Sequence, residues 1–372
     1  MRVTKLIIHL DKFRHNIKCV QERVGTHPLL CVPVKADAYG HGAVAIANTA
    51  LSAGAACFAI ARVEEGIQLR RAGITAPILF LSLASPQDLR RIAIYRLSPF
   101  VAEHQDISRL VYTASNIGVK ISVHLKIDTG MGRIGCRPED ALNLARHIAN
   151  SPALEYSGTA THLAVSDSQD PSDIQYTNHQ LSIFADAVAA IRQAGIDPGI
   201  VHAANSGAVI QHPAAYQDMV RPGIVLYGYS PIPGFPVEPV MEMCSAIIFI
   251  KKVRAGESIS YGRTWTAPED TQIATIPVGY ADGLPRLLSG KHRVLIKKKF
   301  YPLVGRICMD QCMVDLGPNT DIRRGEPVTI FGGDADSASV IADTLGTIPY
   351  EIICAIKKRV PRICIKNEGI RS

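Results

Sequence analysis

The feature that most constrains the fold is the alternation of short apolar runs with helix-like segments before residue 225. Eight of these runs have the length and composition of buried strands. They lie at residues 29–34, 57–60, 78–81, 98–101, 121–127, 156–161, 200–203 and 218–221. Amphipathic segments lie between them at residues 64–72, 86–94, 138–148 and 174–194. Alternating strands and helices form parallel sheets, and eight strands in one run favour a (β/α)8 barrel of the TIM type over an open sheet.

The pattern changes near residue 230, where the segment PIPGFPVEP is rich in proline and glycine and is typical of a linker. Strand-like runs follow at residues 245–253, 272–278, 293–296, 313–316 and 327–331, and helix-length segments at 337–345 and 350–356. We therefore predict an α/β chain of two domains. A barrel covers residues 1–232 and a β-rich domain covers 233–372, and the first strand, within 1–10, is a candidate member of the β-rich domain.

Composition excludes several classes of partner. The net charge of +7 is mild and basic residues are not interleaved with aromatic ones, so no nucleic acid is expected; the basic run Lys297–Lys299 is predicted as a solvated turn. Nine scattered cysteines are typical of free thiols in a reducing, cytoplasmic compartment, and no metal site is expected. The uncharged stretch 43–61 favours a helix and a strand, so no membrane association is expected. The N-terminal segment MRVTKLIIHLDKF lacks a long apolar core and a small-residue cleavage site, so no signal peptide is expected.

A lysine follows the first apolar run, in the segment PVKADAYGHG at residues 33–42. Active sites of (β/α)8 barrels lie at the C-terminal ends of the strands, which is where Lys35 is expected. A partly desolvated lysine loses its proton more readily and can act as a nucleophile or a base. By position alone, a lysine that extends to water is the preferred interpretation.

Polar groups at other strand ends change that preference. They stand in the segments HLKIDTGMGRIG (124–135), HAANSGA (202–208) and VRPGIVLYG (220–228), and in Thr161-His162. Each has an ordinary explanation alone: a loop ion pair for Arg133, a core histidine for His162, a helix cap for Ser206, a surface charge for Arg221. Together they favour a site for an anionic cofactor, with Ser206 and the backbone of Gly223 and Ile224 as phosphate donors. Neither a Walker-type loop nor a G-x-G-x-x-G after a strand is present, which disfavours a nucleotide.

Seven motifs in order resemble the alanine racemase family, bacterial pyridoxal-phosphate enzymes with a barrel and a β-domain. The motifs are VPVKADAYGHG, LKIDTGMGRIG, HAANSGA, VRPGIVLYG, SYGRTWTA, VGYADGLPR and GRICMDQCMVDL, and they span nearly the whole chain. The resemblance implies that Lys35 binds pyridoxal phosphate covalently and that Arg221 faces its pyridine nitrogen. The remaining positions implied around the cofactor are Tyr39, His162, Asn205, Ser206, Gly223, Ile224 and Tyr350.

The resemblance also implies two opposed bases, Lys35 on one face of the substrate and Tyr261 from a partner subunit on the other. The predicted enzyme is a homodimer with shared sites that racemises alanine and supplies D-alanine for peptidoglycan. Lys126 matches a lysine that is often carbamylated, and its carbamate would hold Arg133. The implied substrate-binding residues are Arg133, Met309 and Asp310, and the implied entry gate consists of Tyr280, Tyr350, Arg286 and Arg306.

Two alternatives remain open from the sequence. A broader amino-acid or serine racemase of the same family is one, although the phenol of Tyr350 suits a methyl side chain. Pro349 departs from the family pattern beside this gate and bears on substrate size. A non-catalytic pyridoxal-phosphate carrier is the other, and the β-rich domain with Tyr261 argues against it.

Overall fold

A computed structural model describes residues 3–366 of the chain, which forms two compact units. One unit, the barrel unit, comprises Phe13–Ala38 and Gly42–Val237. The other, the β-rich unit, comprises Met1–Lys12, Tyr39–His41 and Glu238–Ser372. The ends of the two predicted domains, residues 1–2 and 367–372, lie outside the described residues.

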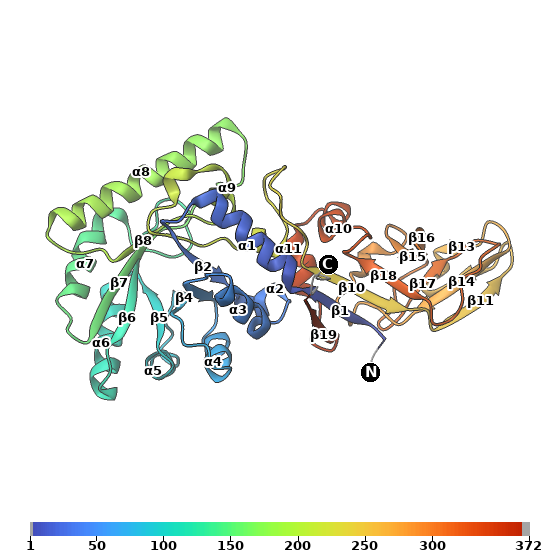
Figure 1. The fold of residues 1–372 in the computed structure, drawn as a ribbon, viewed down its shortest axis with the longest axis horizontal. Coiled ribbons are helices and arrows are strands. Elements are labelled where there is room, and N and C mark those ends of the chain that lie inside the picture. Colours follow the sequence, from blue (N-terminus) through green and yellow to red (C-terminus); the bar gives the residue numbers. More distant parts are fainter. Residues whose placement is uncertain (1–2, 367–372) are drawn as a thin grey trace, which may run out of the picture. The chain divides into compact units, whose positions relative to one another are not determined.

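The barrel unit contains eight parallel strands (Figure 1). They are β2 (Leu29–Pro33), β3 (Cys57–Ile60), β4 (Ile78–Leu83), β5 (Leu97–Val101), β6 (Ile121–Lys126), β7 (Leu154–Ala160), β8 (Ile200–His202) and β9 (Met219–Val220). The sheet order is β8-β7-β6-β5-β4-β3-β2-β9. Backbone bonds from Asp218 N to Val201 O (3.0 Å) and from Arg221 N to Ala204 O (2.9 Å) join the region of β9 to that of β8. The predicted (β/α)8 barrel is therefore confirmed.

Helices cover the outside of these strands, as α4 to α8 show in Figure 1. The helices in this part of the chain are α1 (Leu10–Val24), α3 (Ala43–Ser52), α4 (Val63–Arg71), α5 (Leu89–Ile94), α6 (His104–Ile117), α7 (Ala141–Ala149), α8 (Pro171–Gln193) and α9 (Ser206–Gln211). Neither α1 nor α6 was predicted from the sequence. Within the strands, a core cluster packs Cys31, Cys57, Ala59, Leu79, Phe100, Ala160 and Met219. Residues 3–366 contain no helix that combines the length and the apolar character needed to cross a bilayer.

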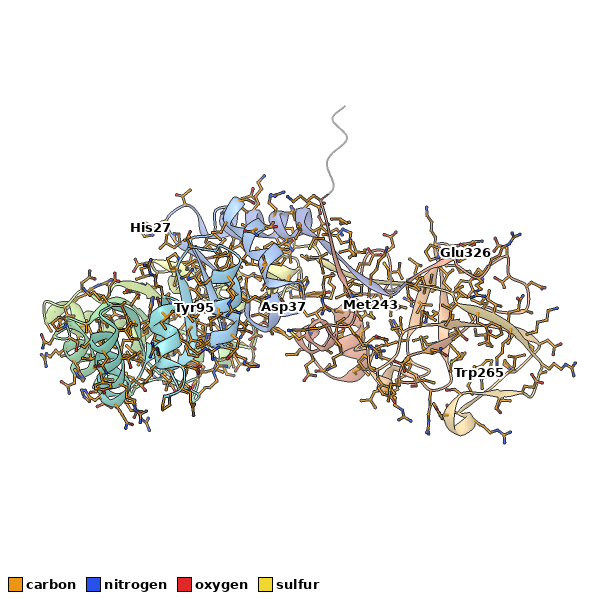
Figure 2. All side chains as sticks on the ribbon, turned by 90° about the horizontal axis from the view of Figure 1, so that it is seen from below. His27, Asp37, Tyr95, Met243, Trp265 and Glu326 are labelled. Atoms are coloured by element: carbon orange, nitrogen blue, oxygen red, sulfur yellow. The ribbon has the colours of Figure 1, made fainter. Side chains whose placement is uncertain are left out.

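A nine-stranded sheet dominates the β-rich unit, in the order β11-β14-β17-β16-β15-β18-β10-β1-β19. Its strands are β1 (Lys5–His9), β10 (Met241–Ala246), β11 (Phe249–Val253), β14 (Thr271–Ile276), β15 (Arg293–Ile296), β16 (Lys299–Val304), β17 (Cys312–Asp315), β18 (Pro327–Phe331) and β19 (Arg362–Ile365). A two-stranded ribbon, β12 (Ser258–Ile259) with β13 (Trp265–Thr266), and helices α10 (Ala338–Leu345) and α11 (Pro349–Ala355) complete the unit. Trp265, labelled in Figure 2, packs against a buried cluster that includes Ile259 and Ile273.

Strand pairing in this sheet joins distant parts of the chain. β1 lies antiparallel to β10 and parallel to β19. The run 245–253, predicted as one strand, is instead divided between β10 and β11. At the break, Ile247 N donates to Glu326 O (3.1 Å) and Ile248 N donates to Thr275 O (3.0 Å), so the two halves pair with different neighbours. Lys297 and Lys298 form the tight turn between β15 and β16, with φ of 47° and 65°, which agrees with the predicted turn.

Candidate active site

Lys35 follows β2 at the C-terminal end of the first barrel strand. The four strand residues Leu30–Pro33 are buried, whereas Lys35 is half-buried, so its stem leaves the core where the strand ends. The buried hydroxyl of Tyr227 donates to Pro33 O at 2.7 Å and holds that strand end. After Lys35 the backbone enters α2 (Lys35–Tyr39), a left-handed turn that includes Asp37 (Figure 2).

Arg221 is a buried charge of the site, with 6% of its surface exposed. One terminal nitrogen of its guanidinium donates to Nδ1 of His202, and the other donates to Thr161 O (2.9 Å) and Ala203 O (3.1 Å). Nε2 of His202 lies 2.9 Å from Nδ1 of His124. Burial lowers the pKa of Arg221 to about 10, which leaves it charged at neutral pH. Arg221 is therefore a fixed buried cation that three acceptors orient.

Other basic groups lie close to Arg221. Burial, and then the charge of Arg221, lowers the pKa of Lys126 to about 7. The Nζ of Lys126 donates to Ile127 O at 2.9 Å. Burial also lowers the pKa of His162 well below its usual value, with further contributions from Arg221, Lys126, Arg133 and Lys35. These five basic side chains, brought together from different strand ends, form the group that we call the basic cluster.

The basic cluster fits an anionic group. Among residues 3–366, no carboxylate lies within ion-pair distance of Arg221, and Nε of Arg221 has no hydrogen-bond acceptor. A buried cation is costly without a compensating negative charge. The carboxylate of Asp128, near Lys126, accepts hydrogen bonds from Gly130 N (3.0 Å) and Gly132 N (3.1 Å). The donors of the basic cluster thus suit an acceptor-rich anion.

Ser206 gathers backbone donors beside the ends of β8 and β9. It is the first residue of α9, and its Oγ accepts from Gly223 N (2.8 Å) and Val225 N (3.4 Å). Ile224 begins the 3-10 turn η3 (Ile224–Tyr227) between these two donors. The hydroxyl of Ser206 keeps its own hydrogen to donate and, with Ile224 N, suits a phosphate, whereas Gly223 N and Val225 N already donate to Ser206 Oγ.

Asn205 has a structural task in this region. As the N-cap of α9, its Oδ1 accepts from Ala208 N (3.1 Å) and from the hydroxyl of Ser166 (2.6 Å), and its Nδ2 donates to Leu163 O (3.2 Å). Both the oxygen and the nitrogen of its side-chain amide form hydrogen bonds within the protein. Its cofactor-binding role stays a prediction. Arg133 lies exposed in the loop after β6.

The other predicted residues belong to the β-rich unit. Within it, the rings of Tyr39 and Tyr350 pack with centroids 5.9 Å apart. Pro349 occupies the first turn of α11, where its fixed φ suits a helix start. The two tyrosines predicted beside the phosphate are therefore neighbours. The presence of proline at position 349 is explained by the start of α11.

Tyr261 begins the 3-10 turn η4 (Tyr261–Arg263) after β12 and is 70% exposed. Gly262 has φ of 72°, and a Cβ there would lie 3.0 Å from the guanidinium carbon of Arg306. Ser260 Oγ donates to Arg306 O at 2.6 Å. Tyr261 and Arg306 therefore share one corner of the unit, and Tyr261 projects to the surface.

Backbone hydrogen bonds join the motifs VGYADG and CMD. Tyr280 N donates to Cys308 O (3.1 Å) and Ala281 N donates to Met309 O (3.0 Å). Met309 is 54% exposed and Tyr280 is 40% exposed. Arg359, which the sequence analysis did not select, bonds both Asp310 (2.5 Å) and the buried Asp282 (2.7 Å). Arg286 lies exposed in η5 (Arg286–Leu288).

Two further residues of the site, His124 and His202, were not predicted either. Both stand in segments that were selected for other residues, HLKIDTGMGRIG and HAANSGA. Each histidine stands inside an apolar run that predicts a buried strand. This was the signal that could have identified them, because a buried imidazole needs a polar partner.

Sequence profiles of the alanine racemase N-terminal and C-terminal domains match residues 8–231 and 240–364. An alanine racemase of Treponema denticola is 48% identical over 375 residues, which cover 98% of this chain and 99% of that protein. A crystal structure of an alanine racemase from Bacillus anthracis with bound L-Ala-P superimposes with a TM-score of 0.91 at 34% identity, and covers 100% of this chain and 97% of that one. An alanine racemase structure from Clostridium difficile 630 gives a TM-score of 0.94 at 35% identity, with 99% and 97% covered. The chain belongs to the alanine racemase family.

Proposed function

We propose that this chain interconverts L-alanine and D-alanine with pyridoxal phosphate as its cofactor. The observation that carries the proposal is the basic cluster around Arg221, a buried cation with an available donor and no carboxylate partner among residues 3–366. A phosphorylated ring with an acceptor nitrogen would supply the missing negative charge and acceptor. Family membership supports the choice of substrate.

The residues that match the family motifs would hold the cofactor. Lys35 would bind it covalently, and Arg221 would donate to its ring nitrogen. Ser206, with the backbone of Gly223 and Ile224, would bind the phosphate. The other residues assigned to the cofactor are Tyr39, His162, Asn205 and Tyr350.

Two side chains, those of Lys35 and Tyr261, would transfer the proton to and from the substrate Cα. When bound, pyridoxal phosphate withdraws electrons from the substrate Cα and acidifies its hydrogen. Lys35 Nζ takes or returns that proton on one face, and the hydroxyl of Tyr261 of the partner subunit does so on the other. Arg221 stays protonated, donates to the ring nitrogen and limits the electron demand of the ring, which favours rapid reprotonation over side reactions.

Substrate binding and access involve the remaining predicted residues. Arg133, with Met309 and Asp310 of the partner subunit, would bind the substrate carboxylate. A Lys126 amine with a pKa of about 7 is partly neutral at physiological pH. A neutral amine reacts with carbon dioxide, so Lys126 is suited to form a carbamate that pairs with Arg133. The entry gate would consist of Tyr280, Tyr350, Arg286 and Arg306.

The assembly and location follow from this assignment. Residues 1–232 would bind the cofactor, and residues 233–372 would supply Tyr261 to the second subunit of a homodimer. All nine cysteines are free, which suits a reducing compartment, and we place the enzyme in the cytoplasm. Its D-alanine would serve peptidoglycan synthesis.

The deciding experiment is to incubate the purified protein with pyridoxal phosphate and L-alanine and to separate the product enantiomers. We expect D-alanine to accumulate until the two enantiomers are equal. Absorbance of a lysine-bound cofactor without D-alanine, and without exchange of the α-hydrogen in deuterium oxide, would instead identify a carrier. With serine as substrate, we expect a kcat/KM about 10–100-fold lower, because an apolar pocket rejects an added hydroxyl only weakly.

A further inference from the structure

The backbone after Lys35 is held in a rare conformation. Ala36, Asp37, Ala38 and Tyr39 have φ between 52° and 55°, and none of the four is glycine. Left-handed backbone places the Cβ of an L-residue against the following carbonyl oxygen, so a run of such residues persists only where its surroundings hold it. Whatever holds this turn also sets where Lys35 leaves β2.

Some hydrogen bonds stabilise the turn from within its own stretch of chain. Ala38 N donates to Val34 O (2.8 Å), Gly42 N donates to Asp37 O (2.9 Å), and Ala43 N donates to a carboxylate oxygen of Asp37 (2.8 Å). These bonds close the turn locally. They do not attach it to the neighbouring strand and helix of the barrel.

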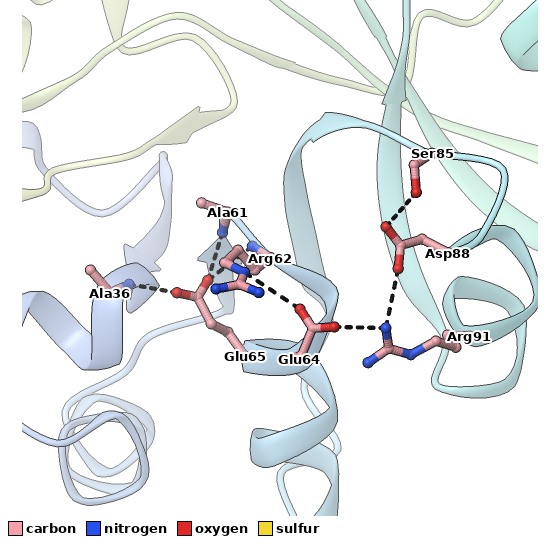
Figure 3. A network of polar contacts seen from close by, with 8 residues as sticks. All are labelled: Ala36, Ala61, Arg62, Glu64, Glu65, Ser85, Asp88 and Arg91. Atoms are coloured by element: carbon pink, nitrogen blue, oxygen red, sulfur yellow. Dashed lines mark hydrogen bonds and ion pairs between the residues drawn. The ribbon is translucent and has the colours of Figure 1, made fainter. Parts of the chain in front are cut away.

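Glu65 makes that attachment. Its Oε1 accepts a hydrogen bond of 2.6 Å from Ala36 N, the residue directly after Lys35 (Figure 3). Its Oε2 accepts from Ala61 N (2.8 Å) and Arg62 N (3.0 Å) at the start of α4. One half-buried carboxylate thus serves three backbone N–H groups, and it joins the loop after β2 to the loop after β3.

The chemistry of this contact requires a carboxylate. Ionised glutamate accepts on both oxygens, whereas glutamine has one acceptor and presents an NH2 group at the other position. In Glu65→Gln, the side-chain NH2 group would face either Ala36 N or the two N–H groups of the helix start, and neither can accept a hydrogen bond from it. The substitution therefore breaks one side of the bridge at almost unchanged size.

We propose that Glu65 is a positioning residue for Lys35: it stabilises the left-handed turn through Ala36 and so orients the amine. The inference rests on the proposed function for the part that concerns catalysis. Its structural part, that the Glu65 carboxylate holds the turn, stands independently of any reaction.

The neighbour Glu64 offers a matched control. It lies on the same helix and in the same network, but its carboxylate pairs with the side chains of Arg91 (2.7 Å) and Arg62 (3.5 Å) (Figure 3). Arg91 keeps a second partner in Asp88 at 3.2 Å. A glutamine at residue 64 therefore makes the same change of charge without touching the turn.

The test compares Glu65→Gln with Glu64→Gln, and adds Ala36→Gly to the first. Glycine adopts left-handed backbone without a Cβ clash. With Ala36→Gly, the turn should therefore need less stabilisation from Glu65. Amide hydrogen exchange of residues 35–40 is measured in the protein without cofactor. The rate at which Lys35 binds pyridoxal phosphate, followed by absorbance, and kcat and KM for alanine are measured on the same variants.

We expect Glu65→Gln to speed exchange of residues 35–40 at least tenfold, to slow cofactor capture and to lower kcat at least tenfold while KM changes less than threefold. Glu64→Gln should stay within twofold of the unmodified protein in all four. Ala36→Gly should recover much of the loss in the double variant. Faster exchange confined to residues 61–71, no recovery by Ala36→Gly, or no effect of Glu65→Gln would each overturn the proposal. Failure of the unmodified protein to racemise alanine would refute the proposed function alone, because the exchange measurement still decides the role of Glu65.

Discussion

Nδ1 of His202 lies 2.5 Å from a terminal guanidinium nitrogen of Arg221. A guanidinium has only donors, so Nδ1 must accept and the proton of His202 must be on Nε2. Nε2 then donates to Nδ1 of His124, 2.9 Å away. Burial and the charge of Arg221 keep both histidines neutral by lowering their pKa values, that of His124 to about 3. The two imidazoles thus form a neutral chain that orients the buried cation.

Replacement of Arg221 by lysine should weaken cofactor binding. A buried lysine loses its proton far more readily than arginine and lacks the planar fork that meets three acceptors. We expect Arg221→Lys to raise the Kd for pyridoxal phosphate by about 10–100-fold, equivalent to about 1–3 kcal/mol. Absorbance titration of the cofactor-free protein measures this, with the exposed Arg90→Lys as control. Equal affinity of both variants would contradict the role of Arg221.

Removal of the Lys35 amine should abolish catalysis. Under the proposed mechanism Lys35→Ala loses both the covalent attachment and one of the two bases, so racemisation should fall by more than about 10³-fold. The absorbance of the lysine-bound cofactor should disappear with it. Lys18→Ala, on the exposed side of α1, should keep full activity. A Lys35→Ala protein that still racemises alanine at the normal rate would refute the proposed mechanism.

Removal of the Tyr261 hydroxyl should separate proton exchange from racemisation. Under the proposed mechanism Tyr261→Phe keeps Lys35 as the base on one face of Cα and has no base on the other, so racemisation should drop by about 10²–10⁴-fold. One enantiomer of alanine should still exchange its α-hydrogen with deuterium oxide faster than it racemises, as mass spectrometry measures. If exchange and racemisation fall equally for both enantiomers, Tyr261 is not the second base.

Mixed variants test whether two chains share each site. Under the proposed mechanism Lys35→Ala and Tyr261→Phe should each be nearly inactive alone, but a hybrid dimer would contain one site with both residues intact. Random re-association should therefore restore about a quarter of the unmodified activity. Mixing either variant with itself is the control. Absence of recovery, in a mixture shown by mass spectrometry to contain hybrids, would argue that each site uses one chain only.

Lys126 should make stability depend on pH. The unfolded chain keeps a proton on Lys126 up to its ordinary pKa of 10.5, whereas the folded amine loses it near 7. Between these values the unfolded state binds more protons, so the free energy of unfolding rises with pH, by about 1 kcal/mol per pH unit. Lys126→Met lacks this contribution.

Urea unfolding at pH 7, 8 and 9 in buffer free of carbon dioxide should therefore show the unmodified protein gaining stability relative to Lys126→Met. Below pH 7 the difference should become constant. A difference that is independent of pH, or that falls as pH rises, would refute the lowered pKa of Lys126.

Local sequence determined where the elements of this protein lie. Two of the predicted β-rich runs, 293–296 and 327–331, coincide with β15 and β18, and Lys35 stands at the end of a predicted strand. These features follow from residues within about ten positions of each other, because apolar periodicity and turn residues act locally.

Tertiary structure alone decided which distant groups meet. β1 pairs with strands more than two hundred residues away, and His124 finds His202 over the intervening strand β7. The run 245–253 divides between two partners, and the left-handed turn after Lys35 is attached through Glu65. In each case a backbone or side-chain donor is satisfied by an acceptor that only the folded chain brings near, and no local pattern encodes that choice.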